Sequence, residues 1–127
     1  MTRDSNKPYP PAASRRRAER RGRWAEYVAA AYLLTKGYSI AALRYKTRAG
    51  EVDLIARKGD LIVFVEVKAR RDLLAAVDAV TLTSQNRIRV AGDHWLSRQP
   101  DAARLSLRYD IVAIVPRAWP RHIEGAF

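Results

Sequence analysis

The sequence predicts an α/β fold in which helices flank a mixed β-sheet. Two observations lead to this prediction. Apolar residues recur at three- and four-residue steps in two segments, as in amphipathic helices, and they alternate or form short runs in four others, as in strands. The order of these segments is helix, three strands, helix, strand, which is typical of a sheet with helices on its faces. A length of 127 residues suits one domain.

The first helix is expected from about Arg20 to Lys36. Gly37 follows at the position where a glycine often ends a helix. An apolar stripe along this helix is expected to face the core, and it comprises Trp24, Tyr27, Val28, Ala31, Tyr32 and Leu34. Trp24, like Trp95 of the second helix, is expected in the core rather than as a platform for stacked bases.

Residues 1–20 are predicted to form a flexible basic arm, and residues 21–127 the folded domain. The arm holds Pro8, Pro10 and Pro11 and almost no aliphatic side chains. The chain up to Arg23 carries eight basic and two acidic residues. Such an arm can follow a phosphate backbone, and the alternative is a solvated tail.

The rest of the chain predicts four strands and a second helix. Strands are expected at residues 38–46, 51–57, 61–69 and 104–115, the middle two as a hairpin. Residues 70–80 are expected to be mostly loop, with room for one short turn of helix. The second helix is expected from about Thr83 to Arg98, with Thr83 as its cap. Gly92 weakens this helix but does not forbid it.

The strongest compositional feature is a net charge of +11, from 24 basic and 13 acidic residues. Arginine supplies 19 of the 24, and its planar group matches phosphate. This balance indicates a nucleic-acid partner, with a solvated basic surface as the alternative. The lack of cysteine excludes disulfides and zinc sites built on cysteine, and His94 and His122 are expected on the surface. No apolar run suits a membrane span or a secretory signal, which fits a cytoplasmic protein.

A two-residue turn at residues 59–60 is expected to set the register of the hairpin, whereas a three-residue loop would shift the pairing by one position. The two-residue turn pairs Ile55 with Phe64, and it leaves one face of the hairpin entirely apolar, which predicts that this face is buried. That face comprises Val52, Leu54, Ala56, Leu61, Val63, Val65 and Val67.

The opposite face carries charged residues at the end away from the turn. The register places Asp53 opposite Glu66 and Glu51 opposite Lys68. Two opposed carboxylates repel each other, so a divalent cation such as Mg²⁺ between them would give a reason for their position. Lys68 points into the same site and can hold or deprotonate a water molecule. The alternative is a surface cluster of salt bridges, in which Asp53 binds Lys68 and Glu66 binds an arginine. Glu51 is expected to pair with an arginine.

An acid on one strand, followed by Glu-x-Lys on the next, resembles the core of PD-(D/E)xK nucleases. Here the acid is Asp53, and Glu66 and Lys68 form the second half. More closely, residues 22–127 resemble the bacterial YraN family, an endonuclease-like group. The matching stretches are GRWAEYVAAAYLLTKGY, GEVDLIA, LIVFVEVKARR, AAVDAVT, SQNRI, RYDIVAI and HIEGAF. There are two departures: Val52 stands where the motif's name has proline, and Ser84 where relatives usually carry a basic residue.

The resemblance implies a restriction-endonuclease-like core, similar to that of archaeal Holliday-junction resolvases, within residues 21–127. It implies that Asp53 and Glu66 bind the metal, and that the main-chain carbonyl of Val67 adds a ligand. It also implies that Lys68 lies beside the attacking water.

The resemblance assigns two further residues to the site. Glu26, on the first helix, would lie near the metal. It shares a helix face with Ala29, Ala30 and Leu33, and the small alanines would let the helix approach the sheet and bring Glu26 inward. Gln85 would reach either the site or the nucleic acid.

Together these features predict an endonuclease that uses Mg²⁺ or Mn²⁺ to hydrolyse phosphodiester bonds, most simply in DNA. The expected phosphate contacts are Arg70, Arg71, Arg87 and Arg89. One alternative is a non-catalytic module that binds nucleic acid on the same scaffold, and another is a basic domain that binds an acidic protein. A homodimer is a further expectation by analogy with resolvases, although the apolar last strand suits the core equally. Asp110 is expected to be structural, paired with Arg108 or Arg104.

Overall fold

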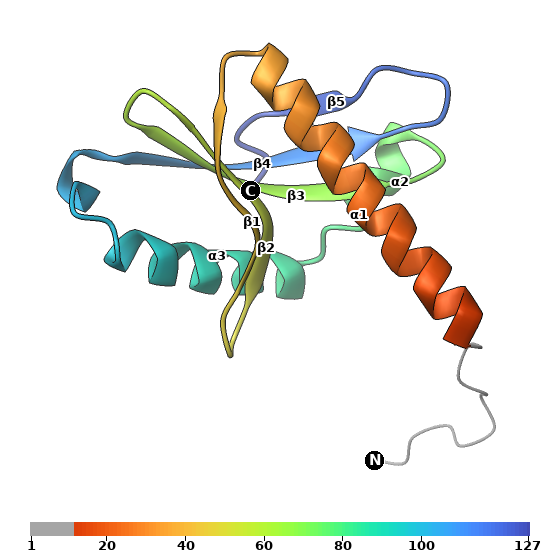
Figure 1. The fold of residues 1–127 in the computed structure, drawn as a ribbon, viewed down its shortest axis with the longest axis horizontal. Helices are drawn as coiled ribbons and strands as arrows, with labels where there is room; N and C mark the ends of the chain where they lie inside the picture. Colours follow the sequence, from red (N-terminus) through yellow and green to blue (C-terminus); the bar gives the residue numbers. More distant parts are fainter. Residues whose placement is uncertain (1–11) are drawn as a thin grey trace.

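Five strands form one mixed sheet with helices on both of its faces in the computed structural model, which describes residues 12–127 (Figure 1). The elements follow in the order α1 (Ala12–Thr35), β1 (Ser39–Lys46), β2 (Glu51–Lys58), β3 (Leu61–Ala69), α2 (Leu73–Asp78), α3 (Leu82–Ser97), the 3-10 turn η1 (Ala102–Arg104), β4 (Ser106–Ile114) and β5 (Arg121–Ile123). The α/β class predicted from the sequence is therefore confirmed. No helix in this part of the chain has the length and apolar character needed to cross a membrane.

The strands lie in the order β1-β2-β3-β4-β5, and all neighbours are antiparallel except β3 and β4. Parallel neighbours need a long crossover, which here is the segment that contains α2 and α3. β4 is hydrogen-bonded to β3 on one side and to β5 on the other. The apolar last strand of the sequence prediction therefore lies inside the sheet rather than at a free edge.

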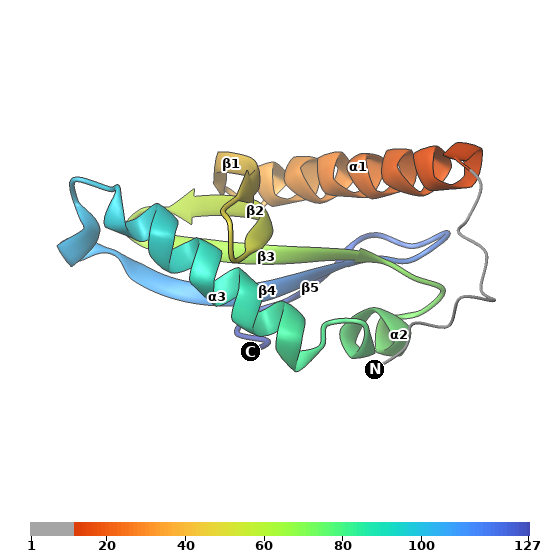
Figure 2. The same ribbon diagram turned by 90° about the horizontal axis from the view of Figure 1, so that it is seen from below.

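Two separate cores lie above and below the sheet. Figure 2 shows α1 over one face, with α2 and α3 against the other. On the α1 face, Ala29 and Leu33 pack against Val65 and its neighbours. On the α3 face, Ile88 packs in a second cluster around Phe64. Because the two helical layers sandwich the sheet, β3 at its centre is covered on both faces.

Helix α1 differs from its prediction in length. It begins at Ala12 rather than near Arg20, so the second half of the predicted arm is helical. The remainder of the predicted arm, residues 1–11, lies outside the described residues.

The buried face of α1 also differs from the predicted apolar stripe. Trp24 is 62% exposed and Tyr27 63%, so Trp24 is not the core residue that the sequence suggested. The buried residues are small, with Ala25, Ala29 and Ala30 at 8% exposure or less. Small side chains let the helix lie close to the sheet, whereas aromatic rings on that face would hold it away. Glu26 shares this face, as expected from its position.

Helix α3 is capped by Thr81 rather than by Thr83. The side-chain oxygen of Thr81 accepts a hydrogen bond from the amide of Ser84 at 3.1 Å. Gly92 has a packing role, because a Cβ atom there would lie 3.2 Å from the ring of Phe64. Trp95 is buried at 9% exposure, as predicted.

Two short elements complete the fold. The segment 70–80, expected to be mostly loop with one short turn of helix, contains α2, whose cap is the side chain of Asp72. The strand β5, which was not foreseen, pairs Ile123 with Ile111 at the edge of the sheet. A three-residue strand carries too little periodicity to be detected from sequence.

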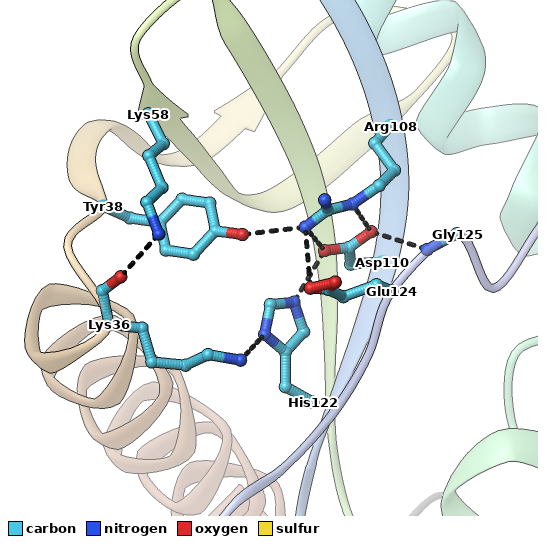
Figure 3. Close-up of polar contacts among 8 residues, drawn as sticks. All are labelled: Lys36, Tyr38, Lys58, Arg108, Asp110, His122, Glu124 and Gly125. Carbon is cyan, nitrogen blue, oxygen red and sulfur yellow. Dashed lines mark hydrogen bonds and ion pairs between the residues drawn. The ribbon is translucent and has the colours of Figure 1, made fainter.

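A buried polar cluster joins β4 to β5 and to the end of α1 (Figure 3). Asp110 is fully buried and accepts hydrogen bonds from Arg108 at 2.8 Å and from His122 at 2.6 Å. The ammonium of Lys36 lies 2.7 Å from the other ring nitrogen of His122. Lysine can only donate, so this nitrogen accepts, and the nitrogen facing Asp110 carries the proton. The predicted pairing of Asp110 with Arg108 is confirmed.

The prediction of a surface position for His122 is wrong. Its side chain is 1% exposed, while His94 is exposed as expected. Burial favours a raised pKa for Asp110, but the hydrogen bonds from His122 and Arg108 outweigh burial and lower the pKa of this carboxyl. The cluster is therefore a structural ion pair at the opposite end of the α1 core from the fork described below.

Candidate metal centre

The predicted site lies in a fork where β2 and β3 separate. Near the turn the register is as predicted, with Ile55 opposite Phe64, and the last pair of this ladder is Leu54 with Val65. Beyond it β2 stays paired with β1, and β3 stays paired with β4 (Figure 1). The expected cross-strand pairs at the charged end are therefore not formed. The strands separate here, but the carboxylates of Asp53 and Glu66 remain close enough to interact.

Asp53 bridges the two arms of the fork. One of its carboxylate oxygens, Oδ2, accepts a hydrogen bond of 2.8 Å from the main-chain amide of Val67. This contact stands where a strand-to-strand hydrogen bond would otherwise lie. The alternation of β2 also breaks here, because Val52 packs with Ile55 in the α3-side core. The predicted position of Val52 on the same face as Leu54 is therefore wrong.

A cavity of about 610 Å³ opens at the fork between α1 and the start of α3. It is lined by Gly22, Ala25, Glu26, Glu51, Asp53, Glu66, Val67, Lys68, Ala69, Arg70, Ser84 and Arg87. The sequence-predicted acids and Lys68 thus lie around one cavity. They come from α1 and from the hairpin of β2 and β3, which meet at this end of the sheet.

Burial and the neighbouring acid change the proton affinity of Asp53. Burial raises its pKa from 3.8 to about 8, with further contributions from hydrogen bonding to Glu66 and from repulsion between the two charges. The Val67 amide and Lys68 act in the opposite direction and are weaker. Without a cation, Asp53 therefore retains its proton near neutral pH.

Glu26 lies between Asp53 and an arginine of β1. Burial raises the pKa of Glu26, while its hydrogen bond from Arg44 at 2.5 Å acts to lower it. The nearby charge of Asp53 also raises it. Arg44 has a φ of 53°, a left-handed conformation that is strained for a residue with a side chain. Sequence analysis missed Arg44, because nothing in the pattern of β1 signals this conformation.

The ligands available at the fork suit an ion such as Mg²⁺, which needs only a few oxygen ligands from the protein. Within residues 12–127, no group of three His, Cys, Asp or Glu side chains is arranged to hold a metal. Two carboxylates are nonetheless sufficient for Mg²⁺, which usually keeps several waters and often takes oxygens from a substrate phosphate. Asp53 and Glu66 are such a pair. The carbonyl of Val67 as an added ligand stays a prediction.

The salt-bridge alternative finds no support in the described part of the chain. None of the ion pairs within 4.0 Å there involves Asp53, Glu66 or Lys68. Glu51, expected to pair with an arginine, is likewise in none of them and lines the cavity instead. Asp53 and Glu66 are half-buried, and partly desolvated carboxylates that stand close together favour a compensating cation.

The predicted phosphate contacts fall into two groups. Arg70 and Arg87 line the cavity, and Arg71 lies just beyond it. Arg89 points elsewhere, with its guanidinium 5.2 Å from the ring centre of Tyr109. Gln85 does not line the cavity, and its side-chain amide lies 3.5 Å from the carbonyl of Val80.

The chain is similar to a family of bacterial proteins. The model of "Uncharacterised protein family UPF0102" matches residues 25–114. The chain belongs to this family, which is also known as the YraN family. The UPF0102 match contains all the acids that line the cavity, together with Lys68. The resemblance noted from the sequence motifs is therefore confirmed.

Several curated UPF0102 relatives match most of the chain. The UPF0102 protein RL0336 of Rhizobium johnstonii is 65% identical over 115 residues, which cover 91% of this chain and 94% of that protein. The UPF0102 protein Atu0303 of Agrobacterium fabrum is 64% identical over 113 residues, with 89% and 93% covered. The UPF0102 protein mlr4633 of Mesorhizobium japonicum is 58% identical over 117 residues, with 92% and 94% covered.

Proposed function

We propose that this protein is a nuclease of the PD-(D/E)xK type that uses Mg²⁺ or Mn²⁺ to hydrolyse phosphodiester bonds in DNA, on a restriction-endonuclease-like core. The observation that carries the proposal is the fork between β2 and β3. There Asp53 and Glu66 share a cavity with Lys68, and neither acid has a cationic partner among the described residues. Such a pair of carboxylates is a ligand set for a divalent cation.

Each residue of the cavity has a role in this proposal. Asp53, Glu66 and the carbonyl of Val67 would hold the ion, and the ion would supply stabilisation of negative charge on the phosphoryl oxygens and acidify water at the site. The ammonium of Lys68 donates hydrogen bonds that hold the attacking water in line with the phosphorus. Glu26, whose pKa is raised by burial, is suited to accept a proton from that water.

The charge of the protein supports DNA as the substrate. The net charge of +11 attracts a polyanion, and Arg70 and Arg87 stand at the cavity to contact phosphates on either side of the bond to be cut. They also offset the repulsion between the acids of the cavity and the DNA backbone. Gln85 and Arg89 are proposed to contact DNA outside the cavity.

Cleavage assays with and without the metal test this function. Flapped, splayed-arm and four-way-junction DNA would be incubated with the protein in Mg²⁺, in Mn²⁺ and in EDTA. Cleavage is expected only with a metal, and Asp53→Asn is expected to abolish it. In EDTA the affinity of that variant for DNA should equal that of the wild type near pH 7, where Asp53 holds its proton, and should exceed it above pH 8, where the wild type carries one more negative charge. Asp78→Asn is the matched control, because Asp78 is exposed at the end of α2.

Calorimetry separates the nuclease from a module that binds nucleic acid without cutting it. Mg²⁺ or Mn²⁺ would be titrated into the wild type and into the double variant Asp53→Ala, Glu66→Ala, each with and without bound DNA. A nuclease binds the metal only with both carboxylates present. If the wild type binds DNA equally well in EDTA and never binds metal, the catalytic proposal is wrong and the binding module remains.

A further inference from the structure

A second cavity lies beside the candidate metal centre and has a different character. Its volume is about 950 Å³, and its walls are mainly apolar. One wall is the exposed side of α1, with Trp24 and Val28. The opposite wall is the segment 114–120, which joins β4 to β5 and carries Trp119. We call this cavity the tryptophan groove.

The two tryptophans of the groove are unusually exposed. Trp24 is 62% exposed and Trp119 is 82% exposed. Among the described aromatic pairs, neither ring contacts another ring. Large apolar rings exposed together in a cavity mark a binding surface more often than a structural one. Their faces are available to a flat ligand.

The groove also carries positive charge. Arg70, Arg71 and Arg117 line it, and no acidic residue is among the described residues that do so. The neighbouring metal centre is lined by four acids. Aromatic faces combined with guanidinium groups suit a ligand that has both a flat ring and a negative charge, as a nucleotide has.

The groove adjoins the candidate metal centre, because Ala69 and Arg70 line both cavities. A nucleotide next to a phosphate in the candidate metal centre would therefore lie within reach of the groove. In a duplex both faces of a base are covered by stacked neighbours, so only an unpaired base can present a face to a tryptophan.

The loop that carries Trp119 is held in shape by its backbone. Arg117 has a φ of 60°, in the left-handed region that favours glycine. Pro116 and Pro120 restrict the chain on either side of it. A loop with few accessible conformations loses less entropy when it binds a ligand. Strained backbone of this kind often accompanies a functional surface.

We propose that the tryptophan groove binds an unpaired nucleotide next to the phosphate to be cut. The substrate class is then DNA with a single-stranded segment at the cleavage position, such as a flap or a splayed arm. The link to cleavage rests on the proposed nuclease function, whereas binding of the single strand does not.

A binding assay without metal tests the groove separately from catalysis. Fluorescein-labelled oligothymidylate of 12 nucleotides and a labelled duplex of 12 base pairs would be titrated with protein in EDTA, with fluorescence anisotropy as the readout. Trp24→Ala and Trp119→Ala are each expected to weaken single-strand binding by about 5- to 100-fold, the range of base–aromatic stacking. Trp24→Phe and Trp119→Phe should retain most of the affinity, because a ring remains. Affinity for the duplex, which depends on phosphate contacts, should be unchanged in all four variants.

Tyr27→Ala is the matched control for this assay. Tyr27 is 63% exposed on the same helix but does not line the groove, so its loss should leave single-strand affinity unchanged. Equal affinity of the wild type and the Trp→Ala variants for oligothymidylate would overturn the proposal. So would a wild-type dimer in sedimentation that dissociates in Trp119→Ala without loss of single-strand affinity, because a second copy of the chain would then occupy the groove. If the tryptophans are needed for single-strand binding but no metal supports cleavage, the proposal for the groove is supported and the proposed nuclease function is wrong.

Discussion

The carboxylate of Asp53 accepts a hydrogen bond from the main-chain amide of Val67, 2.8 Å away, across the fork between β2 and β3. This contact fixes one oxygen of Asp53 at the point where the two strands separate. Glu66, the residue before Val67, is thereby held close to the same carboxylate. A single hydrogen bond thus holds the carboxyl group of Asp53 beside that of Glu66, and without a cation Asp53 can be ionised only against burial and the charge of Glu66.

Replacing Asp53 by asparagine is expected to stabilise the protein without metal. The unfolded chain releases the Asp53 proton near pH 3.8, whereas burial keeps it bound in the folded state up to about pH 8. Stability of the wild type therefore falls as pH rises through this window, by at most about 1.4 kcal/mol per pH unit. Asparagine does not titrate, and its side-chain oxygen can still accept from Val67. Thermal unfolding in EDTA, followed from pH 4 to pH 9, checks this.

The stability gain of Asp53→Asn should be largest at pH 8–9 and should vanish toward pH 4. Asp78→Asn should follow the wild type over the whole range, because that side chain is exposed. A variant that is less stable than the wild type at every pH would show that the carboxylate of Asp53 is compensated within the fold.

Bound Mg²⁺ is expected to stabilise the folded protein by compensating the charges of Asp53 and Glu66. A ligand that binds only the folded state stabilises it by about 1.4 kcal/mol when its free concentration is ten times the dissociation constant. The melting temperature of the wild type should therefore rise with Mg²⁺ concentration. The double variant Asp53→Ala, Glu66→Ala should show no such rise. Equal increases in both proteins would indicate that Mg²⁺ acts at another position.

Gly50→Ala is expected to displace the strand that carries Asp53. A Cβ atom at this position would lie 2.0 Å from the main-chain carbonyl oxygen of Arg87 in α3, so the hairpin and helix must move apart. The expected loss of stability is about 1–3 kcal/mol, as for other overpacked sites. Gly22→Ala is the control, because no atom lies within 4 Å of its added methyl group and alanine favours a helix by about 0.5–1 kcal/mol. Urea unfolding of both variants measures the contrast.

Asp110→Ala is expected to destabilise the protein by about 3 kcal/mol at pH 7. The variant leaves Arg108 and the proton of His122 without their buried acceptor. The pKa of Asp110 is lowered in the folded state, so its stabilising effect is present above its ordinary value and is lost as pH falls through the lowered one. The difference in the free energy of unfolding between the wild type and Asp110→Ala should therefore become smaller at acidic pH.

The exposed pair of Asp60 and Arg57 provides the comparison for Asp110. The Asp60 side chain is 61% exposed, so Asp60→Ala should cost no more than about 1 kcal/mol. Urea unfolding at pH 7 and pH 3 tests both variants. An Asp110→Ala protein as stable as Asp60→Ala would mean that Arg108 finds another partner, for which Glu124 at 3.6 Å is placed.

The sequence was a good guide where local rules act alone. The glycine-containing turn at residues 59–60 determined the hairpin register up to the pair of Leu54 and Val65. The same rules could not predict the fork. It arises because the carboxylate of Asp53, rather than a main-chain carbonyl of β2, accepts the hydrogen bond from the amide of Val67. The acids were still found, because their chemistry conflicts with their place in an apolar hairpin.

The errors arose where tertiary contacts decide. The aromatic residues of α1 have helical periodicity, but the sheet lies against the alanine face, and Trp24 remains exposed. His122 sits in a short edge strand, and only the fold brings it to Asp110 and Lys36. Neither outcome is encoded in a local pattern.

The proposed cleavage site and the proposed nucleotide-binding groove lie on parts of the fold that differ in how well they tolerate insertions and substitutions. Glu66 and Lys68 stand on β3, which is paired with β4 along this stretch and has helices over both faces. Trp119 stands on a surface connection between β4 and β5, where insertions and deletions disturb few contacts. An evolving or engineered relative can therefore lengthen or rebuild that connection to accept a different DNA shape, while the acids and the lysine keep their positions. The preference for a DNA shape can therefore change during evolution while the residues proposed to cleave the DNA stay the same.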